Sequence, residues 1–397
     1  MESQAQNPTT SPTAATGAEA ATGAEAAPAS VDEEKVFVAS QWQLMWWRFR
    51  KHKLAMAGSV VLVVLYLVAF LCEFLAPYDP LEQRKYNSVA PPQRMRFWDK
   101  DGFSLRPFIY GLNRQRDPDT LRLIYTPNPE KKYPVHFFVH GYAYKMWGLI
   151  PTDLHLFGVE GQEEEGATVF LLGTDVLGRD LFSRLMYGTR ISLSVGLVGI
   201  AFSFLLGITM GGISGYYGGT ADLIVQRLIE FLRAVPGIPL WMALSAALPA
   251  TWPPLRVYFG ITVILSFLGW TGLARVVRGR FLALREEDFI MAARLVGSSE
   301  MRIIFRHMVP SFTSYIIASL TLSIPGMILS ETSLSFLGLG LRPPVVSWGV
   351  LLQGGQNLQA IAQAPWLLAP GVFVIVTVLA FNFMGDGLRD AADPYSR

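Results

Sequence analysis

The feature that most constrains this chain is a set of long segments without any charged residue. Residues 191–221 carry no charge over 31 positions, and residues 54–72 carry none over 19. Roughly 20 consecutive apolar residues are needed to cross a bilayer as a helix. Only 16% of all residues are charged, against roughly 25% in an ordinary soluble domain. The sequence therefore predicts an integral membrane protein built from helices.

The apolar segments predict six transmembrane helices, centred on residues 54–72, 191–221, 222–248, 257–274, 308–330 and 366–385. Basic and aromatic residues at 42–53 precede the first helix, which predicts a cytoplasmic N-terminus by the positive-inside rule. Six spans then place both termini in the cytoplasm. The loop 275–306 lies on the same side and carries seven arginines, against one arginine in each of two short outer loops. Arg179, Arg184 and Arg190 disagree with this orientation, because they lie on the outer side before the second span. The positive-inside rule is weak beside a long translocated domain, so we keep the orientation.

The rest of the chain divides into regions of different character. Residues 1–35 have low complexity and few large apolar groups, which predicts a disordered tail. An interfacial helix and the first transmembrane helix occupy 40–76. Residues 78–170 form a polar insert with 16 aromatic residues, too many for a disordered linker. We expect it to be a folded, extracytoplasmic insert of mixed or irregular structure, with short strands near 121–125 and 135–140. The five other spans occupy 187–388.

Several residues of the insert have two interpretations. Its aromatic side chains are expected either to form a small core or to present an anchor to a partner, as for Trp98, Tyr142, Tyr144 and Trp147. His136 and His140 share one face in either a strand or a helix, but no third ligand has diagnostic spacing. We favour the interpretation that His136 and His140 are ordinary surface side chains, and we expect no metal and no cofactor.

The segment REEDFIMAARLVGSSEMRIIFRHMVPS at 285–311 has the strongest local pattern. It predicts two short helices with a turn at Gly297, where a left-handed backbone suits glycine. Pro310 is expected to begin the next span, where its missing N–H costs least. On spacing alone, the segment is either an amphipathic connector on the membrane surface or a rigid lever for a partner.

A family resemblance bears on this choice. Ala292 and Ala293, then Gly297, then residues 307–310 resemble the EAA loop of bacterial ABC-importer permeases. Met291, His307 and Val309 depart from the general pattern, in the manner of the oligopeptide branch. Segments similar to that branch also include APYDP at 76–80, LLGTDVLGRDLFSRLMYGTRISLSVG at 171–196, ISGYYGG at 213–219, LSFLGLGLRPPVVSWG at 334–349 and LAFNFMGDGLRDAADP at 379–394. The insert 81–170 is longer than the resemblance leads us to expect.

The resemblance implies a fold and a function. The fold is an all-α integral membrane protein with six transmembrane helices and a type I ABC importer permease (MetI-like) core. The function is that of the permease subunit of a dipeptide or oligopeptide importer in the bacterial inner membrane, and not that of an enzyme. Its implied partners are a second homologous permease, two ATP-binding subunits or domains, an extracytoplasmic substrate-binding protein and membrane lipid, without nucleic acid. The ATPase-coupling residues implied within loop 285–310 are Ala292, Ala293, Gly297, Glu300, His307 and Pro310.

Four charged residues fall within the expected spans. Arg227, Glu230 and Arg233 recur at every third position, and Glu331 lies late in the fifth span. A charge inside a bilayer is costly unless it is paired or faces water. The first three either gate the translocation path or form a paired cluster at the cytoplasmic interface. Glu331 either lines an outer cavity or bonds the loop backbone at 337–340.

Three other functions compete with peptide import. The same machine could import oligosaccharides or nickel complexes. An ion-coupled secondary transporter would need an inverted repeat and an acidic residue at mid-membrane, and no clear repeat is found. An intramembrane enzyme, or a membrane anchor for the insert, is disfavoured because the spans hold no Ser/His/Asp or metal-ligand set. The sequence also has no GxxxxGK[ST] phosphate loop, so we expect ATP to be hydrolysed by partners.

Overall fold

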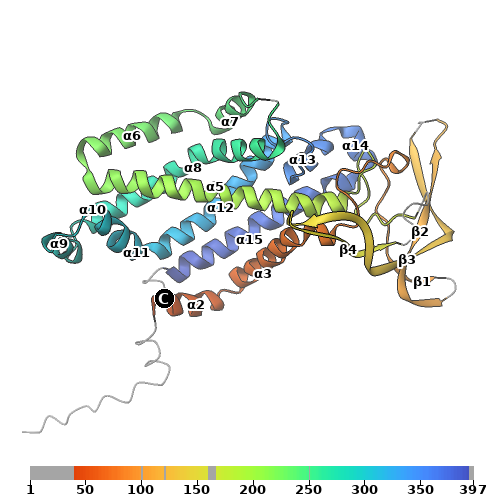
Figure 1. Ribbon diagram of the computed structural model, residues 1–397, viewed down its shortest axis with the longest axis horizontal. Coiled ribbons are helices and arrows are strands. Elements are labelled where there is room, and N and C mark those ends of the chain that lie inside the picture. Colours follow the sequence, from red (N-terminus) through yellow and green to blue (C-terminus); the bar gives the residue numbers. More distant parts are fainter. Residues whose placement is uncertain (1–39, 100–101, 120–121, 160–166, 250, 393–397) are drawn as a thin grey trace, which may run out of the picture. The chain divides into compact units, whose positions relative to one another are not determined.

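The computed structural model describes residues 40–99, 102–119, 122–159, 167–249 and 251–392. The predicted disordered tail, 1–35, lies outside the described residues. The chain divides into two units, Met1–Leu44 and Met45–Arg397. Helix α2, Gln41–Lys51, begins in the first unit, and all other described elements belong to the second. The helices and strands are labelled in Figure 1.

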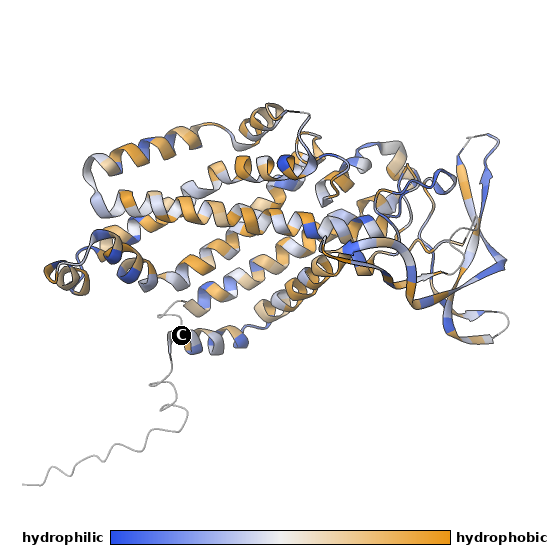
Figure 2. Cartoon of the chain, in the orientation of Figure 1, coloured by the Kyte–Doolittle hydropathy of each residue, from blue (hydrophilic) through white to orange (hydrophobic). Residues whose placement is uncertain are grey.

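Five helices within the described residues are long and apolar enough to cross a membrane. They are α3 (Lys53–Phe70), α5 (Leu181–Tyr217), α8 (Pro254–Leu284), α12 (Thr313–Phe336) and the segment Pro365–Ala392, which joins η4 (Pro365–Leu368) to α15 (Ala369–Ala392). Five of the six predicted spans are therefore confirmed. Figure 2 shows these helices largely in the colour of apolar residues, whereas the strands carry more hydrophilic colour.

The third predicted span, 222–248, is not one continuous helix. It is a pair, α6 (Gly219–Ala234) and α7 (Gly237–Ala246), bent by 86°. Pro236 lies in the break and has no N–H to donate to a preceding turn. Val235, which precedes it, is extended, as residues before proline tend to be. The predicted count of six holds only if this bent pair is one span.

Helix α5 packs closely against α8. A Cβ added to Gly211 would lie 2.5 Å from the carbonyl oxygen of Ala274, and one added to Gly215 would lie 2.6 Å from Cβ of Phe281. These contacts require glycine, because the two backbones approach too closely for a side chain. The glycines therefore fix the distance between the two longest helices.

The insert contains a four-stranded antiparallel sheet in the order β1-β2-β3-β4. Its strands are β1 (Arg96–Asp99), β2 (Gly102–Arg116), β3 (Leu123–Met146) and β4 (Ile150–Val159). Both predicted strands lie within or at the edge of β3. The insert is thus more regular than the mixed or irregular structure expected. The coil that follows the first span contains η1 (Lys85–Asn87). Tyr78 and Ala90, on either side of η1, pack in one cluster with residues of the sheet.

The core of the insert differs from the predicted one. Ile109, Val135 and Phe157 of the sheet pack on Tyr78 and Phe170, the first and last residues of the insert. Trp98 and Trp147, predicted as core or anchor residues, are exposed. Tyr144 is buried and Tyr142 is half-buried, and both contact the ring of His155. Only some of the aromatic side chains are therefore core residues.

Short helices complete the chain between the spans. Those between α8 and α12 are α9 (Asp288–Leu295), α10 (Glu300–Arg302), the π-helical η2 (Ile303–Met308) and α11 (Val309–Ser311). Those between α12 and the last span are α13 (Trp348–Gln353), η3 (Gly354–Gln356) and α14 (Leu358–Gln363). A further turn, α4 (Cys72–Leu75), follows α3. The last span, which begins at Pro365, packs against α3 and α12.

Candidate functional site

The loop between α8 and α12 folds into two short helical pieces around a tight turn. Helix α9 ends at Leu295, and Gly297 follows with a φ of 78°. Its N–H donates to the carbonyl of Arg294 at 2.9 Å, and that of Ser298 donates to Ala293 at 3.1 Å. The predicted two-helix form and the left-handed glycine are confirmed. The second piece differs from the ordinary helix expected, because α10 continues as the π-helical η2.

One face of this loop is fastened to the membrane helices. Ile290 of α9, together with Ile303, Ile304 and Met308, forms a buried cluster. The cluster is completed by Val277 and Phe281 of α8 and by Ile208 of α5, all buried. Ala293 is half-buried against the same cluster. The loop is therefore packed directly on α5 and α8 through a close-packed interior.

The other face of the loop is apolar and exposed. Leu295 is 88% exposed and Val296 is 85% exposed, and Met291, Met301 and Phe305 of the same loop are also exposed. We name these five residues the coupling surface. Exposed apolar side chains gathered in one short segment are typical of a site of interaction.

Polar contacts tie the loop to the turn between α5 and α6. The hydroxyl of Tyr217 donates to Glu300 at 2.7 Å, and the Arg294 guanidinium lies 5.2 Å from the ring centre of Tyr216. Nearby, Arg278 of α8 donates twice to the Asp222 carboxylate, at 2.5 Å each. A bidentate pair of this kind fixes the relative orientation of its two helices. The loop, α5, α6 and α8 therefore meet at one end of the bundle.

The remaining predicted loop residues occupy varied positions. Ala292 is exposed on α9, and His307 is half-buried within the π-helix. Pro310 is exposed in α11 and does not begin the next span, because α12 starts only at Thr313. The chain makes one further short turn between them, which the hydrophobic pattern does not distinguish from the span itself.

The four charged residues predicted within the spans do not form one group. Arg227 and Glu230 of α6 are paired at 2.8 Å, and both are exposed. Arg233 instead donates from Nε to the hydroxyl of Thr271 on α8 at 3.1 Å. The predicted pairing of each with its neighbour is therefore right for the first two residues and wrong for Arg233.

Glu331 is completely buried, and in the described part of the chain its carboxylate is hydrogen-bonded to serine hydroxyls rather than paired with a cation. Its Oε1 accepts hydrogen bonds from the hydroxyls of Ser335 and Ser347, each at 2.8 Å, and Oε2 accepts from Ser192 at 3.4 Å. The interpretation that Glu331 lines an outer cavity is therefore wrong. Buried charges are stable only when hydrogen-bonded, and three hydroxyls supply this here.

The same three serines also hold the loop that follows α12. Their hydroxyl oxygens accept backbone N–H groups, from Leu341 to Ser335 at 3.0 Å, from Trp348 to Ser192 at 3.0 Å and from Val350 to Ser347 at 3.3 Å. Glu331 thus orients the loop through serines rather than by bonding residues 337–340 directly. Sequence reasoning missed the serines, although Ser335 lies four residues after Glu331 and so on the same helix face.

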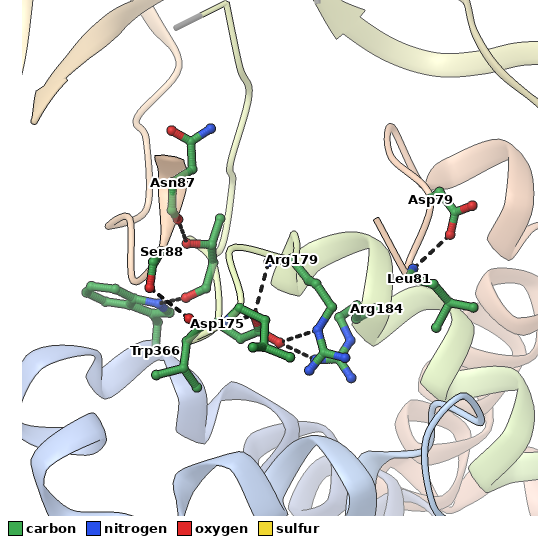
Figure 3. Close-up of polar contacts among 11 residues, drawn as sticks. Asp79, Leu81, Asn87, Ser88, Asp175, Arg179, Arg184 and Trp366 are labelled. Atoms are coloured by element: carbon green, nitrogen blue, oxygen red, sulfur yellow. Dashed lines mark hydrogen bonds and ion pairs between the residues drawn. The ribbon is translucent and has the colours of Figure 1, made fainter. Parts of the chain in front are cut away.

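At the opposite end of the bundle, the three arginines that disagreed with the predicted orientation are paired. Arg179 and Arg184 both donate to Asp175, at 2.7 Å and 2.5 Å (Figure 3). Arg190 forms an ion pair with Glu73 and donates from Nε to the carbonyl of Ala69 at 2.8 Å. Each of the three arginines is thus paired with a carboxylate in the described part of the chain.

The loop that carries Asp175 also joins the insert to the last span. Trp366 donates from its indole N–H to the carbonyl of Thr174 at 2.9 Å, and Ser88 donates to the carbonyl of Val176 at 2.7 Å (Figure 3). The hydroxyl of Thr174 donates to the carbonyl of Asn87 at 2.5 Å. The first segment of the insert is thereby anchored to the membrane helices by hydrogen bonds.

His136 and His140 are not joined by a third metal ligand: among the described residues, no group of three or more His, Cys, Asp or Glu side chains is placed to hold a metal ion. Nδ1 of His140 lies 2.8 Å from Oδ1 of Asp153 on the surface. This hydrogen bond lowers the pKa of the Asp153 carboxyl. The pair is a local surface contact between β3 and β4.

Together, these features define a multi-pass membrane protein with a rigidly supported docking surface at one end and a folded insert at the other. Residues 204–397 match the family described as "Binding-protein-dependent transport system inner membrane component". Residues 40–92 match "N-terminal TM domain of oligopeptide transport permease C".

Curated relatives agree with these matches. The "Dipeptide transport system permease protein DppC" of Bacillus subtilis (strain 168) is 32% identical, over 89% of this chain and 85% of its own. The "Oligopeptide transport system permease protein OppC" of the same organism is 30% identical, over 92% and 94%. A solved structure, of the inward-facing MetNI methionine ABC transporter, is 20% identical and covers 53% of this chain and 96% of its own, with a TM-score of 0.41.

The chain belongs to the family of binding-protein-dependent transport system inner membrane components, in its dipeptide/oligopeptide permease branch. Its fold is that of a type I ABC importer permease. Members of this family are transport permeases, and they work with ATP-binding partners and a substrate-binding protein. The chain is therefore a multi-pass membrane subunit of an ATP-binding-cassette importer.

Proposed function

We propose that this subunit moves di- or oligopeptides across the inner membrane, and that the coupling surface is where an ATP-binding partner drives it. The observation that carries the proposal is the pairing of an exposed apolar face with a buried one on the same short loop. The exposed side, Leu295 and Val296 above all, is shaped for a partner. The buried side, Ile290 and Ile303, transmits the partner's motion to α5 and α8.

The polar contacts support a lever action. Glu300 and Arg294 hold the loop to the last turn of α5, and Asp222 holds α6 to α8. When two ATP-binding partners close, the loops of the two permeases are drawn together, and these contacts carry the rotation into the spans. The subunit thereby alternates between inward and outward access, with all of the energy supplied from outside this chain.

A second homologous permease is the partner proposed for the exposed face of α6. Arg227 and Glu230 lie there beside the exposed side chains of Leu223, Ile224 and Phe231. Charged side chains do not face lipid without a large cost. An ion pair on an otherwise apolar face instead suits a surface that meets another protein or the water-filled path between two subunits. If Arg227 and Glu230 act as a gate, they do so at this interface between the two permeases.

The peptide class rests on the relatives, which are named as dipeptide and oligopeptide permeases and are aligned over most of their length. Oligosaccharides and nickel complexes remain the competing cargoes. Reconstitution of the full importer with its binding protein, followed by uptake of a labelled dipeptide, an oligosaccharide and a nickel chelate, distinguishes them. Uptake of either competitor without peptide uptake would refute the peptide assignment.

The coupling role is tested by Leu295→Asp, which places a charge in the centre of the coupling surface. A charge buried without a partner weakens an interface by several kcal/mol, so association with the ATP-binding partner and ATP-driven uptake should both be lost. Leu105→Asp is the matched control, because Leu105 is a similarly exposed leucine on β2 of the insert. If Leu295→Asp leaves ATPase association and uptake at the level of the control, the coupling surface has been wrongly assigned.

A further inference from the structure

The turn between β3 and β4 exposes an unusual run of apolar side chains. The turn places Trp147 and Gly148 at positive φ, 52° and 74°, and it is closed by hydrogen bonds from the N–H of Gly148 to the carbonyl of Lys145 and from that of Leu149 to Met146. Leu149 is 79% exposed and Ile150 is 53% exposed. A hairpin tip in water is normally polar. We name residues 145–150 the hairpin tip.

The hairpin tip is attached to the end of the first span. The Trp147 ring lies 4.5 Å from the ring of Phe70, the last residue of α3, and its indole N–H donates to the Phe70 carbonyl at 2.8 Å. A second aromatic contact, between Phe138 of β3 and Phe74 of α4, lies close by. The tip is therefore held at a defined height along α3.

The face of α3 that leads to the tip is apolar and exposed, as expected of a helix face that meets lipid. Exposed apolar side chains recur along it at helical spacing, at Val60, Val63, Val64, Leu67 and Phe70. Residues separated by three or four positions lie on one face of a helix. Because Trp147 packs on the last of these residues, the exposed apolar surface of the tip continues this stripe.

The length of α3 places the tip at the membrane boundary. Its 18 residues span about 27 Å, close to the roughly 30 Å of the hydrocarbon core. Lys51 and Lys53 mark one boundary, where basic side chains reach the headgroups. Phe70 therefore lies at the other boundary, and Trp147 beside it occupies the level at which tryptophan is enriched in membrane proteins.

We propose that the hairpin tip dips into the bilayer on the insert side, with Leu149 and Ile150 among the acyl chains and Trp147 at the headgroups. The exposed Lys145 of the same tip fits this placement, because its ammonium group would then lie at the level of the phosphate headgroups. The insert is then a domain that binds the membrane surface beside the first span through its hairpin tip. The partner of this surface is lipid, because the surface is continuous with a lipid-facing helix stripe.

The test measures the depth of one side chain. Leu149→Cys is made in a Cys72→Ala background, spin-labelled and reconstituted in lipid nanodiscs, and its collisions with oxygen and with a water-soluble nickel complex are compared. Leu105→Cys, in the same domain and 86% exposed, is the control for a label in water. Phe70→Cys is the reference for the boundary itself.

We expect the ratio of oxygen to nickel collisions at position 149 to exceed that at position 105 and to match or exceed that at position 70. A ratio at 149 equal to that at 105 would overturn the proposal. So would a low collision rate with both reagents that appears only when the substrate-binding protein is added, because the tip would then be a protein contact. Both readouts are independent of transport, so they stand apart from the substrate proposal.

Discussion

Glu331 is the residue whose environment has the clearest energetic consequence. Its carboxylate accepts from three buried hydroxyls, and these serines in turn accept the backbone of the loop after α12. We expect Glu331→Leu to lower the free energy of unfolding by about 3 kcal/mol or more, since each buried polar group left unsatisfied costs about 1–3 kcal/mol. Thermal unfolding of the purified subunit in detergent measures this loss.

Glu331→Gln is the matched control for that substitution. The amide oxygen can take the place of Oε1, which accepts the two shorter hydrogen bonds, from Ser335 and Ser347. Only the 3.4 Å contact to Ser192 is then weakened. The Gln variant should unfold within a few degrees of the parent. Equal melting temperatures for the Leu variant and the parent would show that the serine network contributes no stability.

Asp180 gives a prediction about pH. It is the N-cap of α5, and its Oδ2 accepts the N–H of Ser183 at 2.7 Å, while Oδ1 has no partner in the described residues. Burial raises the pKa of the Asp180 carboxyl from 3.8 to about 6. The folded state therefore retains a proton that the unfolded chain releases. Its contribution to stability is present below pH 3.8 and is lost as the pH rises through about 6.

The melting temperature should accordingly decline between pH 4 and pH 7 by more in the parent than in Asp180→Asn. Asparagine caps a helix as well as aspartate does but does not ionise. Comparing the two proteins removes the effect of every other titrating group. Parallel pH profiles for parent and variant would contradict the assignment of a raised pKa to this carboxyl.

At the scale of elements, the turn at Gly297 is the most sensitive point. Its φ of 78° is unfavourable for residues with a side chain, and an added Cβ would meet nothing within 4 Å. The effect of a substitution is therefore one of backbone conformation alone, at about 1–2 kcal/mol for a left-handed residue and more for a β-branched one. Gly297→Val should leave the subunit in the membrane yet reduce uptake per ATP hydrolysed.

Gly297→Asn is the control, because asparagine enters the left-handed region more readily than other residues with a side chain. It should keep most of the coupling between ATP hydrolysis and uptake. Reconstituted vesicles allow both rates to be measured in the same preparation. A well-assembled Val variant with the parental ratio of uptake to hydrolysis would remove this turn from the coupling pathway.

Elements whose signal is local were predictable from the sequence. The apolar runs located five spans, and the spacing around Gly297 gave the two-piece loop with its left-handed turn. The break at Pro236 was missed because a proline inside a helical pattern marks either a kink or an end, and the pattern alone does not distinguish them. The hairpin tip was not predicted because the side chains that a turn exposes depend on the register of β3 and β4.

Side-chain partners distant in the sequence were not predictable from a single chain. The contact between Glu73 and Arg190 joins residues 117 positions apart, and that between Glu331 and Ser192 joins residues 139 positions apart. No periodicity encodes such pairs, because they depend on which helices become neighbours. For the same reason Arg179, Arg184 and Arg190 were an exception to the orientation rule, because their carboxylate partners are not evident from the sequence.

For the whole molecule, we propose that both termini and the coupling surface face the cytoplasm and that the insert faces outward. The pairing of Arg179, Arg184 and Arg190 supports this orientation, because it removes the three dissenting cations. Pairing with Asp222 and with Glu286 also removes Arg278 and Arg285 from the inner count, which leaves five of its seven arginines. The excess on the inner side therefore remains.

Cysteine labelling in a Cys72→Ala background tests the orientation. A membrane-impermeant maleimide added outside intact cells should label Leu105→Cys on the insert and spare Ser299→Cys beside the coupling surface. Both positions are exposed, so access alone separates them. Permeabilised cells should allow both to react. Labelling of position 299 from outside, with position 105 protected, would reverse the assignment.

The contacts of Arg190 show which part of α5 lies beside α3 and which part extends beyond it. Arg190 bonds the carbonyls of Ala69 and Phe70, so this point of α5 is level with the end of α3. The far end of the antiparallel α3 then lies near residue 207 of α5. The ten residues from there to Tyr217 rise about 15 Å beyond the hydrocarbon. An ATP-binding partner docked on the coupling surface, as proposed above, would therefore act on the loop in water, outside the hydrocarbon.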